Sequence, residues 1–387
     1  MTDLDWNGCL NARDVAGLPT RYGGTTRAGI IRTDSLHQLD DAGWAAFHQV
    51  RAGLVLDLRS DWEMTEPHPL DGDPAYRRIP WIDPVADQRR MPADEPLMVD
   101  IYRGSLDRNQ GQILKAYRAI AEVPLDVPVV VHCRSGKDRT GLLVALLQEL
   151  AGVPGDVIAA DYAMSETRLG IPDRIAALPG TDEERAAAGL LWRSLPETIL
   201  GALDHVDQRY GGVRAYLARC GLSAREIHRL GLRLLTPVEF EAVVFDFDGL
   251  LINTETTLVE SWQAEARDLG LRVGIASSSP RSWVTGHLER VGALDLFDLV
   301  VTGDEVAAHK PDPAVYQLAL SRLDLPGRLA VAVENTAHGV AAAAAAGMRT
   351  VAMATPDVPA ETLTGAGLVL TGADQLSLSE ALFAVSP

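Results

Sequence analysis

Short apolar runs that end in polar residues recur along this chain. The runs at 129–131, 54–56 and 242–245 are dominated by valine, leucine and other apolar residues, and each leads into an ionisable side chain. Runs of this length and composition predict buried β-strands. Segments with a helical pattern, such as 110–122 and 340–347, lie between the strands. This alternation predicts an α/β protein with parallel sheets.

Further elements follow from the same pattern. We expect helices at 39–44, 142–150, 156–165, 197–216 and 223–235, strands at 76–82, 273–277 and 330–335, a turn at 31–35 and a surface loop at 83–96. A short break at 235–239 precedes the strand at 242–245 and predicts a domain boundary. The expected domains are residues 1–236 and 240–387, each a parallel sheet flanked by helices.

The composition restricts the class of function. The chain has 387 residues and a net charge of −18, which disfavours nucleic acid or an anionic membrane as the main partner. It has no apolar run of the ~18 residues that indicate a transmembrane helix, and the acidic start Met1–Trp6 does not resemble a signal peptide. Cys9, Cys133 and Cys220 make no disulfide framework. We therefore expect a protein of the reducing cytoplasm.

Segment 129–141 places one cysteine at the carboxyl end of a strand, before a tight loop and a helix. Loop amides and a helix N-terminus form an anion cradle, and the same field favours the thiolate of Cys133. Arg139 can grip two phosphate oxygens with its planar fork, and Thr140 can donate to the cysteine sulfur when it leaves. The alternative is a buried structural cysteine. The expected phosphate-binding residues are Arg134, Ser135, Gly136, Lys137, Asp138 and Arg139.

The pattern His-Cys-x5-Arg-Thr at 132–140 resembles the signature loop of the cysteine-dependent protein tyrosine and dual-specificity phosphatases. The segments 11–17 and 57–59 and the Gly-Lys-Asp-Arg-Thr of the loop are similar to a bacterial branch that includes phosphoinositide phosphatases. This resemblance covers residues 6–235. It implies the cysteine-phosphatase fold, a phosphocysteine intermediate and no cofactor at the cysteine site. Arg13 and Asp14 are equally well explained as a salt-bridged turn.

Hydrolysis of a phosphate ester needs a proton donor for the leaving oxygen. Asp83 follows the strand expected at 76–82, where this branch places its proposed general acid, and Asp138 is the alternative. Lys137 resembles the extra cation of inositol-lipid phosphatases and would favour a multiply charged head group. Alternatively, Lys137 only adds to the positive electrostatic field of the loop, and Asp138 forms a salt bridge elsewhere. Asp57 and Arg59 are expected to be structural partners that brace the loop.

The strand at 242–245 ends in Asp246-Phe-Asp248-Gly. The first carboxylate can attack phosphorus and the second can shuttle the proton, while the first carboxylate and a backbone carbonyl hold Mg²⁺. This pattern resembles the phosphoglucomutase-like branch of the haloacid dehalogenase superfamily, which implies a Rossmann-like core. By this resemblance, phosphate is held by Ser277 and Lys310 and Mg²⁺ by Asp246, Asp248, Glu334 and Asn335.

Two features depart from that branch. Asn335 stands where the branch usually has an aspartate, so Mg²⁺ affinity should weaken unless Glu334 compensates. Only 28 residues separate Asp248 from Ser277, where the branch normally has a helical cap domain. We expect room for about one helix there and an open site. The second domain is therefore either a weak, open-site phosphatase or a structural remnant.

Three functional hypotheses follow. The first domain hydrolyses phosphomonoesters through Cys133, acting on phosphotyrosine, phosphoserine, phosphothreonine or a phosphoinositide. The second domain is a Mg²⁺-dependent phosphatase that acts on small phosphate esters through Asp246. Alternatively, the second domain is a non-catalytic interaction module. The expected partners are phosphoproteins, phosphorylated small molecules or lipid head groups.

Overall fold

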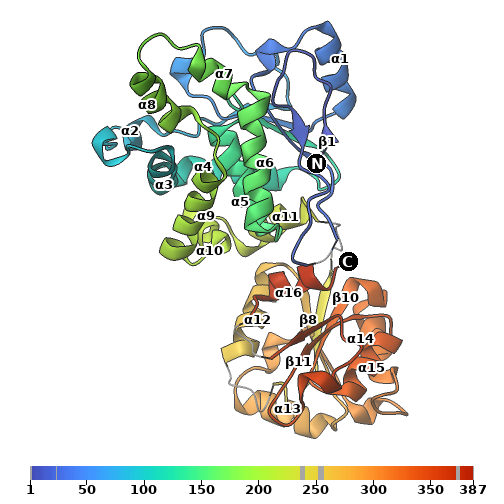
Figure 1. Ribbon diagram of the computed structural model, residues 1–387. Helices are drawn as coiled ribbons and strands as arrows, with labels where there is room; N and C mark the ends of the chain where they lie inside the picture. Colours follow the sequence, from blue (N-terminus) through green and yellow to red (C-terminus); the bar gives the residue numbers. More distant parts are fainter. Residues whose placement is uncertain (1, 23, 236–239, 252–256, 372–374, 387) are drawn as a thin grey trace. The chain divides into compact units, whose positions relative to one another are not determined.

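The chain divides into two compact units, Met1–Thr236 and Pro237–Pro387. The computed structural model (Figure 1) describes all residues except 1, 23, 236–239, 252–256, 372–374 and 387. Most of the break expected at 235–239 therefore lies outside the described residues.

The first unit is built on a sheet of strand order β1-β2-β3-β6-β4-β5. Its strands are β1 (Thr2–Asp3), β2 (Arg13–Asp14), β3 (Ile30–Thr33), β4 (Leu54–Asp57), β5 (Tyr76–Arg78) and β6 (Val129–His132). β3, β6, β4 and β5 are parallel, and β1 and β2 extend one edge in antiparallel pairs. Thr33 and Asp57 both lie opposite His132. The carboxyl ends of three strands therefore meet at the residue before Cys133.

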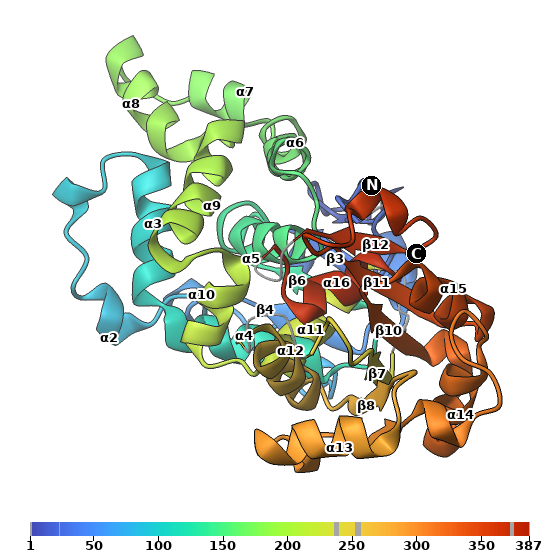
Figure 2. The same ribbon diagram turned by 90° about the horizontal axis from the view of Figure 1, so that it is seen from below.

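Helix α5 (Asp138–Leu150) is the central helix of this unit, because every residue from Leu142 to Leu147 is buried. It packs against β3 and against α6, α9, α10 and α11 (Figure 2). The other helices of the unit are α1 (Asp41–Val50), α2 (Pro84–Asp87), α3 (Met98–Arg108), α4 (Gln110–Glu122), α6 (Gly155–Arg168), α7 (Ile171–Ala176), α8 (Asp182–Trp192), α9 (Pro196–Tyr210), α10 (Val213–Cys220) and α11 (Ala224–Leu232). A helix enclosed in this way holds the loop before it rigidly.

Three expectations about local structure were wrong. The turn expected at 31–35 is largely β3, because Ile30 and Ile31 are buried between β2 and β6. The helix expected at 197–216 is two helices, α9 and α10, since Gly211 and Gly212 take positive φ values of 79° and 100° and interrupt it. The loop expected at 83–96 contains α2 and a 3₁₀ turn at Pro92–Asp94.

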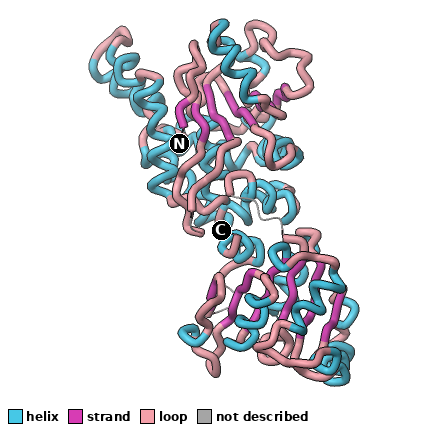
Figure 3. Tube along the Cα trace, turned by 90° about the vertical axis from the view of Figure 1, so that its right-hand side faces the viewer, coloured by secondary structure: helices cyan, strands magenta, loops and turns pink. Residues whose placement is uncertain are grey.

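The second unit has a parallel sheet of order β12-β11-β10-β7-β8-β9. Its strands are β7 (Ala242–Phe245), β8 (Arg272–Ala276), β9 (Leu299–Val301), β10 (Ala330–Glu334), β11 (Arg349–Met353) and β12 (Leu368–Leu370). In Figure 3 the strands of each unit appear as neighbouring magenta segments with helices beside them. β7 and β10 are central and wholly buried, so Asp246 and Glu334 reach the same edge of the sheet.

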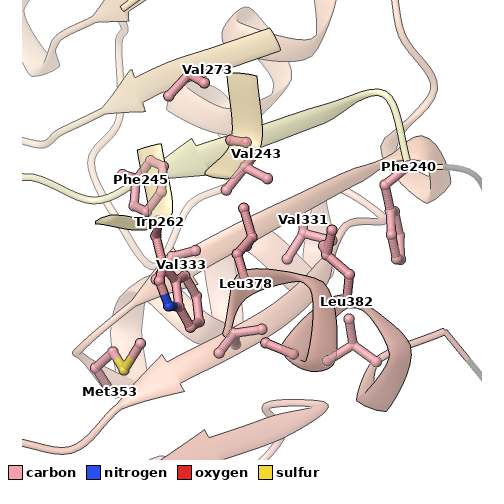
Figure 4. Close-up of a cluster of buried hydrophobic side chains, with 14 of the residues drawn as sticks. Phe240, Val243, Phe245, Trp262, Val273, Val331, Val333, Met353, Leu378 and Leu382 are labelled. Carbon is pink, nitrogen blue, oxygen red and sulfur yellow. The ribbon is translucent and has the colours of Figure 1, made fainter. Parts of the chain in front are cut away.

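Helices cover both faces of this second sheet. They are α12 (Thr257–Asp268), α13 (Arg281–Arg290), α14 (Ala314–Leu323), α15 (Ala337–Ala345) and α16 (Leu378–Ala384). On one face Trp262 and Leu378 pack against Val243, Val331 and Val333 (Figure 4). The alternate residues of β7 and β10 pack with α14 and α15 on the other face. Between β7 and β8 the described residues contain one helix, α12.

The predicted fold class is confirmed: both units are α/β, with mainly parallel sheets flanked by helices. Within the described residues, no helix combines the length and the apolar character needed to cross a membrane.

Candidate active sites

The loop between β6 and α5 carries the predicted nucleophile. Cys133 follows β6 directly and is 2% exposed, and α5 begins at Asp138. Gly136 has a φ of 63°, and a Cβ atom there would lie 2.3 Å from the carbonyl oxygen of Thr33. Only glycine fits this position. The loop therefore turns tightly against the end of β3, around the cysteine.

Donors outside the loop hold its carbonyl groups. Arg134 O accepts from Ser35 N (3.0 Å), Ser135 O from Asn11 Nδ2 (3.0 Å) and Gly136 O from Arg32 Nη2 (2.8 Å). Because the N–H and C=O of a trans peptide point in opposite directions, carbonyls fixed outward turn the following N–H groups inward. An inward ring of N–H groups is an anion-binding concavity.

A buried ion-pair network supports this loop from below. Asp161 on α6 accepts from Arg13 Nε and from Arg32 Nη1, both at 2.8 Å, and all three side chains are at most 1% exposed. Burial alone would raise the pKa of Asp161, but the charges of Arg32 and Arg13 and their hydrogen bonds outweigh it and lower the pKa to about 2. Asp161 therefore fixes Arg32, which in turn holds the loop.

This network differs from the interpretation of Arg13 and Asp14 as a salt-bridged turn. Arg13 pairs with Asp161, while Asp14 accepts from the backbone N–H groups of Ala16 and Gly29. Sequence reasoning did not single out Asp161 or Arg32. Asp161 and Ser165 lie one turn apart on α6 and both contact Arg13, so their spacing is a signal that could have identified this helix face.

Arg139 is held by Glu63. Its Nη2 donates to Glu63 Oε1 at 2.7 Å and its Nη1 donates to Glu63 Oε2. Burial opposes both charges, yet the shared hydrogen bonds lower the pKa of Glu63 and raise that of Arg139. Glu63 therefore accepts from both Nη atoms of Arg139 and fixes the plane of its guanidinium group. No role of Glu63 was predicted from the sequence.

Asp57 and Arg59 are partners, as expected. Arg59 Nη2 lies 2.7 Å from Asp57 Oδ2, and Arg59 Nη1 donates to Ser35 Oγ. Ser35 is the residue whose N–H donates to the loop carbonyl of Arg134. This pair therefore reaches the loop through one intervening residue.

A cleft of about 840 Å³ opens over the loop. Loop residues Arg134, Ser135, Asp138 and Arg139 line it together with Trp62, Ile82, Ile101, Tyr102 and Arg174. Trp62 is 62% exposed. The volume lies within the range of about 300–1,000 Å³ typical of ligand sites. Cys133 itself is buried and is not among the lining residues.

The two candidate acids lie in different places. Asp83 Oδ1 accepts from the N–H groups of Val85 (2.8 Å) and Ala86 (3.1 Å), so it caps α2, and it does not line the cleft. Asp138 lines the cleft, and its Oδ1 accepts from the hydroxyl of Tyr102 at 2.6 Å. The structure thus brings Asp138 to the cleft and keeps Asp83 occupied as a helix cap.

Lys137 and Thr140 make contacts that differ from those expected. Lys137 Nζ donates to the backbone carbonyl of Trp192 at 2.7 Å and lies 3.0 Å from Asp138, so this ammonium faces the C-terminus of α8 and not the cleft. The hydroxyl of Thr140 is buried and has no hydrogen-bond partner among the described residues. The expected bond to the sulfur of Cys133 is therefore not formed.

In the second unit Lys310 joins two carboxylates. Its Nζ donates to Asp246 Oδ1 (2.5 Å), to Glu334 Oε1 (2.7 Å) and to the carbonyl of Ala276 (2.9 Å). Tyr316, which the sequence analysis missed, donates to Glu334 Oε1 at 2.6 Å. Burial and the charge of Glu334 raise the pKa of Asp246, although Lys310 opposes them. The predicted nucleophile and phosphate-binding lysine thus meet at the sheet edge.

Asp248 has donors on both carboxylate oxygens. Oδ2 accepts from Ser277 (3.1 Å) and Ser279 (2.7 Å), and Oδ1 accepts from Trp283 Nε1 (3.0 Å). Its backbone carbonyl accepts from Asn335 Nδ2 at 3.3 Å. The other amide atom, Asn335 Oδ1, is buried and unpartnered within the described part of the chain. The Asn335 amide and the Asp248 carbonyl therefore lie side by side, and oxygen is the ligand that Mg²⁺ prefers.

Part of the second unit is similar to known proteins. The haloacid dehalogenase-like hydrolase model matches residues 264–353. Putative phosphatase YhcW of Bacillus subtilis is 42% identical over 24% of this chain, which spans 42% of YhcW. The chain thus covers less than half of that relative. The crystal structure of CbbY from Rhodobacter sphaeroides with phosphate is 32% identical over 31% of this chain and 55% of CbbY, with a TM-score of 0.30.

The first unit matches a second family. Triple specificity protein phosphatase PtpB of Mycobacterium tuberculosis is 29% identical over 58% of this chain and 95% of PtpB. Tyrosine-protein phosphatase of Nostoc commune is 33% identical over 53% of this chain and 73% of its own length. The tyrosine phosphatase family model matches residues 4–236, more than half of the chain. The chain therefore belongs to the tyrosine phosphatase family, whose members are phosphoric monoester hydrolases.

Proposed function

We propose that the first unit hydrolyses phosphomonoesters through a phosphocysteine formed on Cys133. The observation that carries this proposal is the loop itself, whose carbonyls at 134–136 are tied outward by Ser35, Asn11 and Arg32. The N–H groups that follow face inward, toward the place where the oxygens of a phosphoryl group are held. Cys133 stands at the carboxyl end of β6, at the start of this loop.

The reaction has two displacements. In the first, the sulfur of Cys133 forms a bond to phosphorus, the bond to the leaving oxygen breaks, and that oxygen takes a proton from an acid. In the second, water attacks phosphorus, the S–P bond breaks, and the acid regains a proton from the water. Arg139 stabilises the equatorial oxygens in both steps, because Glu63 keeps its guanidinium in a fixed plane.

We assign the acid to Asp138. A general acid must lie within reach of the leaving oxygen, and Asp138 lines the cleft while Asp83 caps α2. Tyr102 donates to one oxygen of Asp138, which leaves the second oxygen to carry the proton. Asp138 directly precedes Arg139, so the general acid and the phosphate-binding guanidinium both come from the first turn of α5.

The proposed substrate is a phosphoprotein, with phosphotyrosine the main target and dual specificity expected. Trp62 offers an exposed aromatic face beside the loop, and the cleft is wide enough for more than a single side chain. A phosphoinositide is the alternative at the same site, because Arg134 and Arg174 line the cleft and can pair with a multiply charged head group. Lys137 does not support it, since its ammonium is bound to Trp192.

Metal dependence tests the proposal. Hydrolysis of an aryl phosphate by the full chain should continue in EDTA and fall to background in Cys133→Ser, because only the thiolate can form the intermediate. Asp246→Asn should leave this activity unchanged. Activity that EDTA abolishes and Cys133→Ser retains would refute the assignment to the first unit.

For the second unit we propose a weak Mg²⁺ site. Haloacid dehalogenase-like hydrolases commonly use Mg²⁺. The buried Oδ1 of Asn335, which has no partner among the described residues, is an oxygen atom that could bind such an ion. Asp246, the backbone carbonyl of Asp248 and Asn335 would hold it, while Glu334 acts through Lys310. The ion would supply positive charge for a phosphate bound near Ser277. Since amide oxygen carries no formal charge, the affinity should be lower than with a carboxylate.

A further inference from the structure

Two buried histidines lie beside the cysteine loop with unused ring nitrogens. His132, the last residue of β6, is fully buried, and His68 is 4% exposed. Their rings are roughly parallel, with centroids 5.2 Å apart and an angle of 23° between the planes. The Nε2 atoms of both rings are buried and have no hydrogen-bond partner among the described residues. A buried polar atom left unpaired is destabilising, so both Nε2 atoms need a partner.

The backbone partners define the tautomer of each ring. His132 Nδ1 lies 3.2 Å from the carbonyl oxygen of Cys133, which can only accept, so Nδ1 carries the hydrogen and Nε2 has a lone pair. His68 Nδ1 accepts from the N–H of Leu70 at 3.1 Å, so its hydrogen is on Nε2. Burial lowers the pKa of both histidines, that of His68 to about 3, and keeps them neutral. One ring thus offers a donor and the other an acceptor.

The same cluster does not suit a metal ion. One ring nitrogen of each histidine and a carboxylate oxygen of Asp57 lie within 4.8 Å of one another. A metal ion bound there needs the Nε2 lone pair of His68, and the bond from Leu70 N–H makes that nitrogen an N–H donor. Asp57 already accepts from Arg59 at 2.7 Å and from the hydroxyl of Tyr76 at 3.0 Å. The donor set therefore fits a neutral hydrogen-bonding bridge better than a cation.

We propose that one internal water bridges His68 Nε2 and His132 Nε2, and that His68 is thereby a positioning residue for Cys133. One water can accept from a ring N–H and donate to a ring lone pair, and the two rings, with centroids 5.2 Å apart, each leave a buried Nε2 without a partner among the described residues. His68 donates to the water, the water donates to His132, and His132 donates to the carbonyl of Cys133. All three bonds run toward the loop.

This chain has a consequence for the thiolate. With a donor at its Nε2, His132 keeps the Nδ1–H tautomer, and the Cys133 carbonyl keeps its bond. The opposite tautomer would set a ring lone pair against that carbonyl and disturb the peptide that leads into the loop. The charged groups facing the two rings are Asp57 and Arg59, with Tyr76 stacked on His68 at 4.1 Å and His37 at its edge. None of these supplies the missing donor or acceptor.

The experiment measures the thiolate directly. His68→Phe keeps a ring and removes both nitrogens, whereas His68→Gln places an amide N–H near the position of Nε2. The rate of alkylation of Cys133 by iodoacetamide against pH gives its thiol pKa in the full chain, with Cys133→Ser as the blank. We expect His68→Phe to raise that pKa by about one unit, a tenfold loss of thiolate near neutral pH, and His68→Gln to restore most of it. An unchanged profile in His68→Phe would overturn the inference.

A second readout does not depend on variants. Nitrogen-15 NMR of the unmodified chain should report Nε2–H on His68 and Nδ1–H on His132. The reverse tautomers, or histidine signals that shift with one equivalent of Zn²⁺, would overturn the proposal even if His68→Phe fails to fold. The inference rests on Cys133 as the nucleophile of the proposed function, but alkylation needs no turnover. If the unmodified chain showed a low pKa for Cys133 but hydrolysed no phosphate ester, the proposed function would be refuted. The proposed water bridge to His68 would not be affected by that result.

Discussion

Replacement of Asp161 by asparagine tests how the structure holds its loop. The carboxylate of Asp161 lies between Arg13 and Arg32, and all three side chains are at most 1% exposed. The asparagine keeps the shape of the side chain but removes the charge, which leaves two buried guanidinium groups without a counter-ion. Arg32 is also the donor to Gly136 O. The variant should therefore lose both stability and loop order.

The size of the effect follows from the pKa and from the buried ion pair. The pKa of Asp161 falls from 3.8 to about 2 on folding, which corresponds to about 2 kcal/mol of stability for the ionised carboxylate. Removing one partner of a buried ion pair typically costs about 3–5 kcal/mol. We expect a loss of about 2–5 kcal/mol. Because the folded pKa is the lower one, this stability is present above pH ~4 and is lost as the pH falls toward ~2.

Hydrogen exchange followed by mass spectrometry measures the protection of each peptide separately, so the stability of the two units can be followed independently. Peptides from 129–165 in Asp161→Asn should exchange at least tenfold faster than in the unmodified chain, while peptides from 272–353 should not change. Asp156→Asn, at the exposed start of the same helix, is the matched control and should cost under about 1 kcal/mol. Protection in Asp161→Asn equal to that of the control would refute the reasoning about the network.

Further predictions concern the acids and the metal. Asp138→Asn should slow hydrolysis of an alkyl phosphate by about 10²–10⁴-fold and that of an aryl phosphate with a good leaving group much less; equal effects on both esters would contradict the assignment. Asp83→Asn should leave kcat within about twofold and cost about 1 kcal/mol as a lost cap, seen as a lower Tm; a large drop in kcat would restore Asp83 to the mechanism. Asn335→Asp should raise the affinity for Mg²⁺ at least tenfold by titration calorimetry, since a second carboxylate joins Asp246; an unchanged affinity would show that Asn335 is not a ligand.

Much of the first site could be predicted because its residues are contiguous. A strand, a loop and a helix at 129–150 place Cys133 and Arg139 together without help from the rest of the chain. The same holds for Asp246 and Asp248, which follow β7 directly. Local order along the chain was therefore sufficient for the fold class and for the candidate nucleophile of each unit.

The supporting residues could not be predicted in this way. Glu63 is 76 residues from Arg139 in sequence, and Asp161 is 148 residues from Arg13. No spacing rule links such pairs, since their contacts depend on how helices dock on the sheet. His68 is a further example, because its neighbour His132 lies on a central strand and the segment before β5 brings the two rings together.

The order of residues alone thus determined the two α/β units, the cysteine loop and the Asp-x-Asp motif, because strands, helices and turns form from neighbouring residues. Only the tertiary structure decided which aspartate faces the cleft, since Asp138 points there and Asp83 is occupied by two N–H groups of α2. It also decided that Lys137 holds the end of α8. The physical reason is competition for partners: each polar side chain binds the donor or acceptor that packing places nearest, and packing joins segments far apart in the chain.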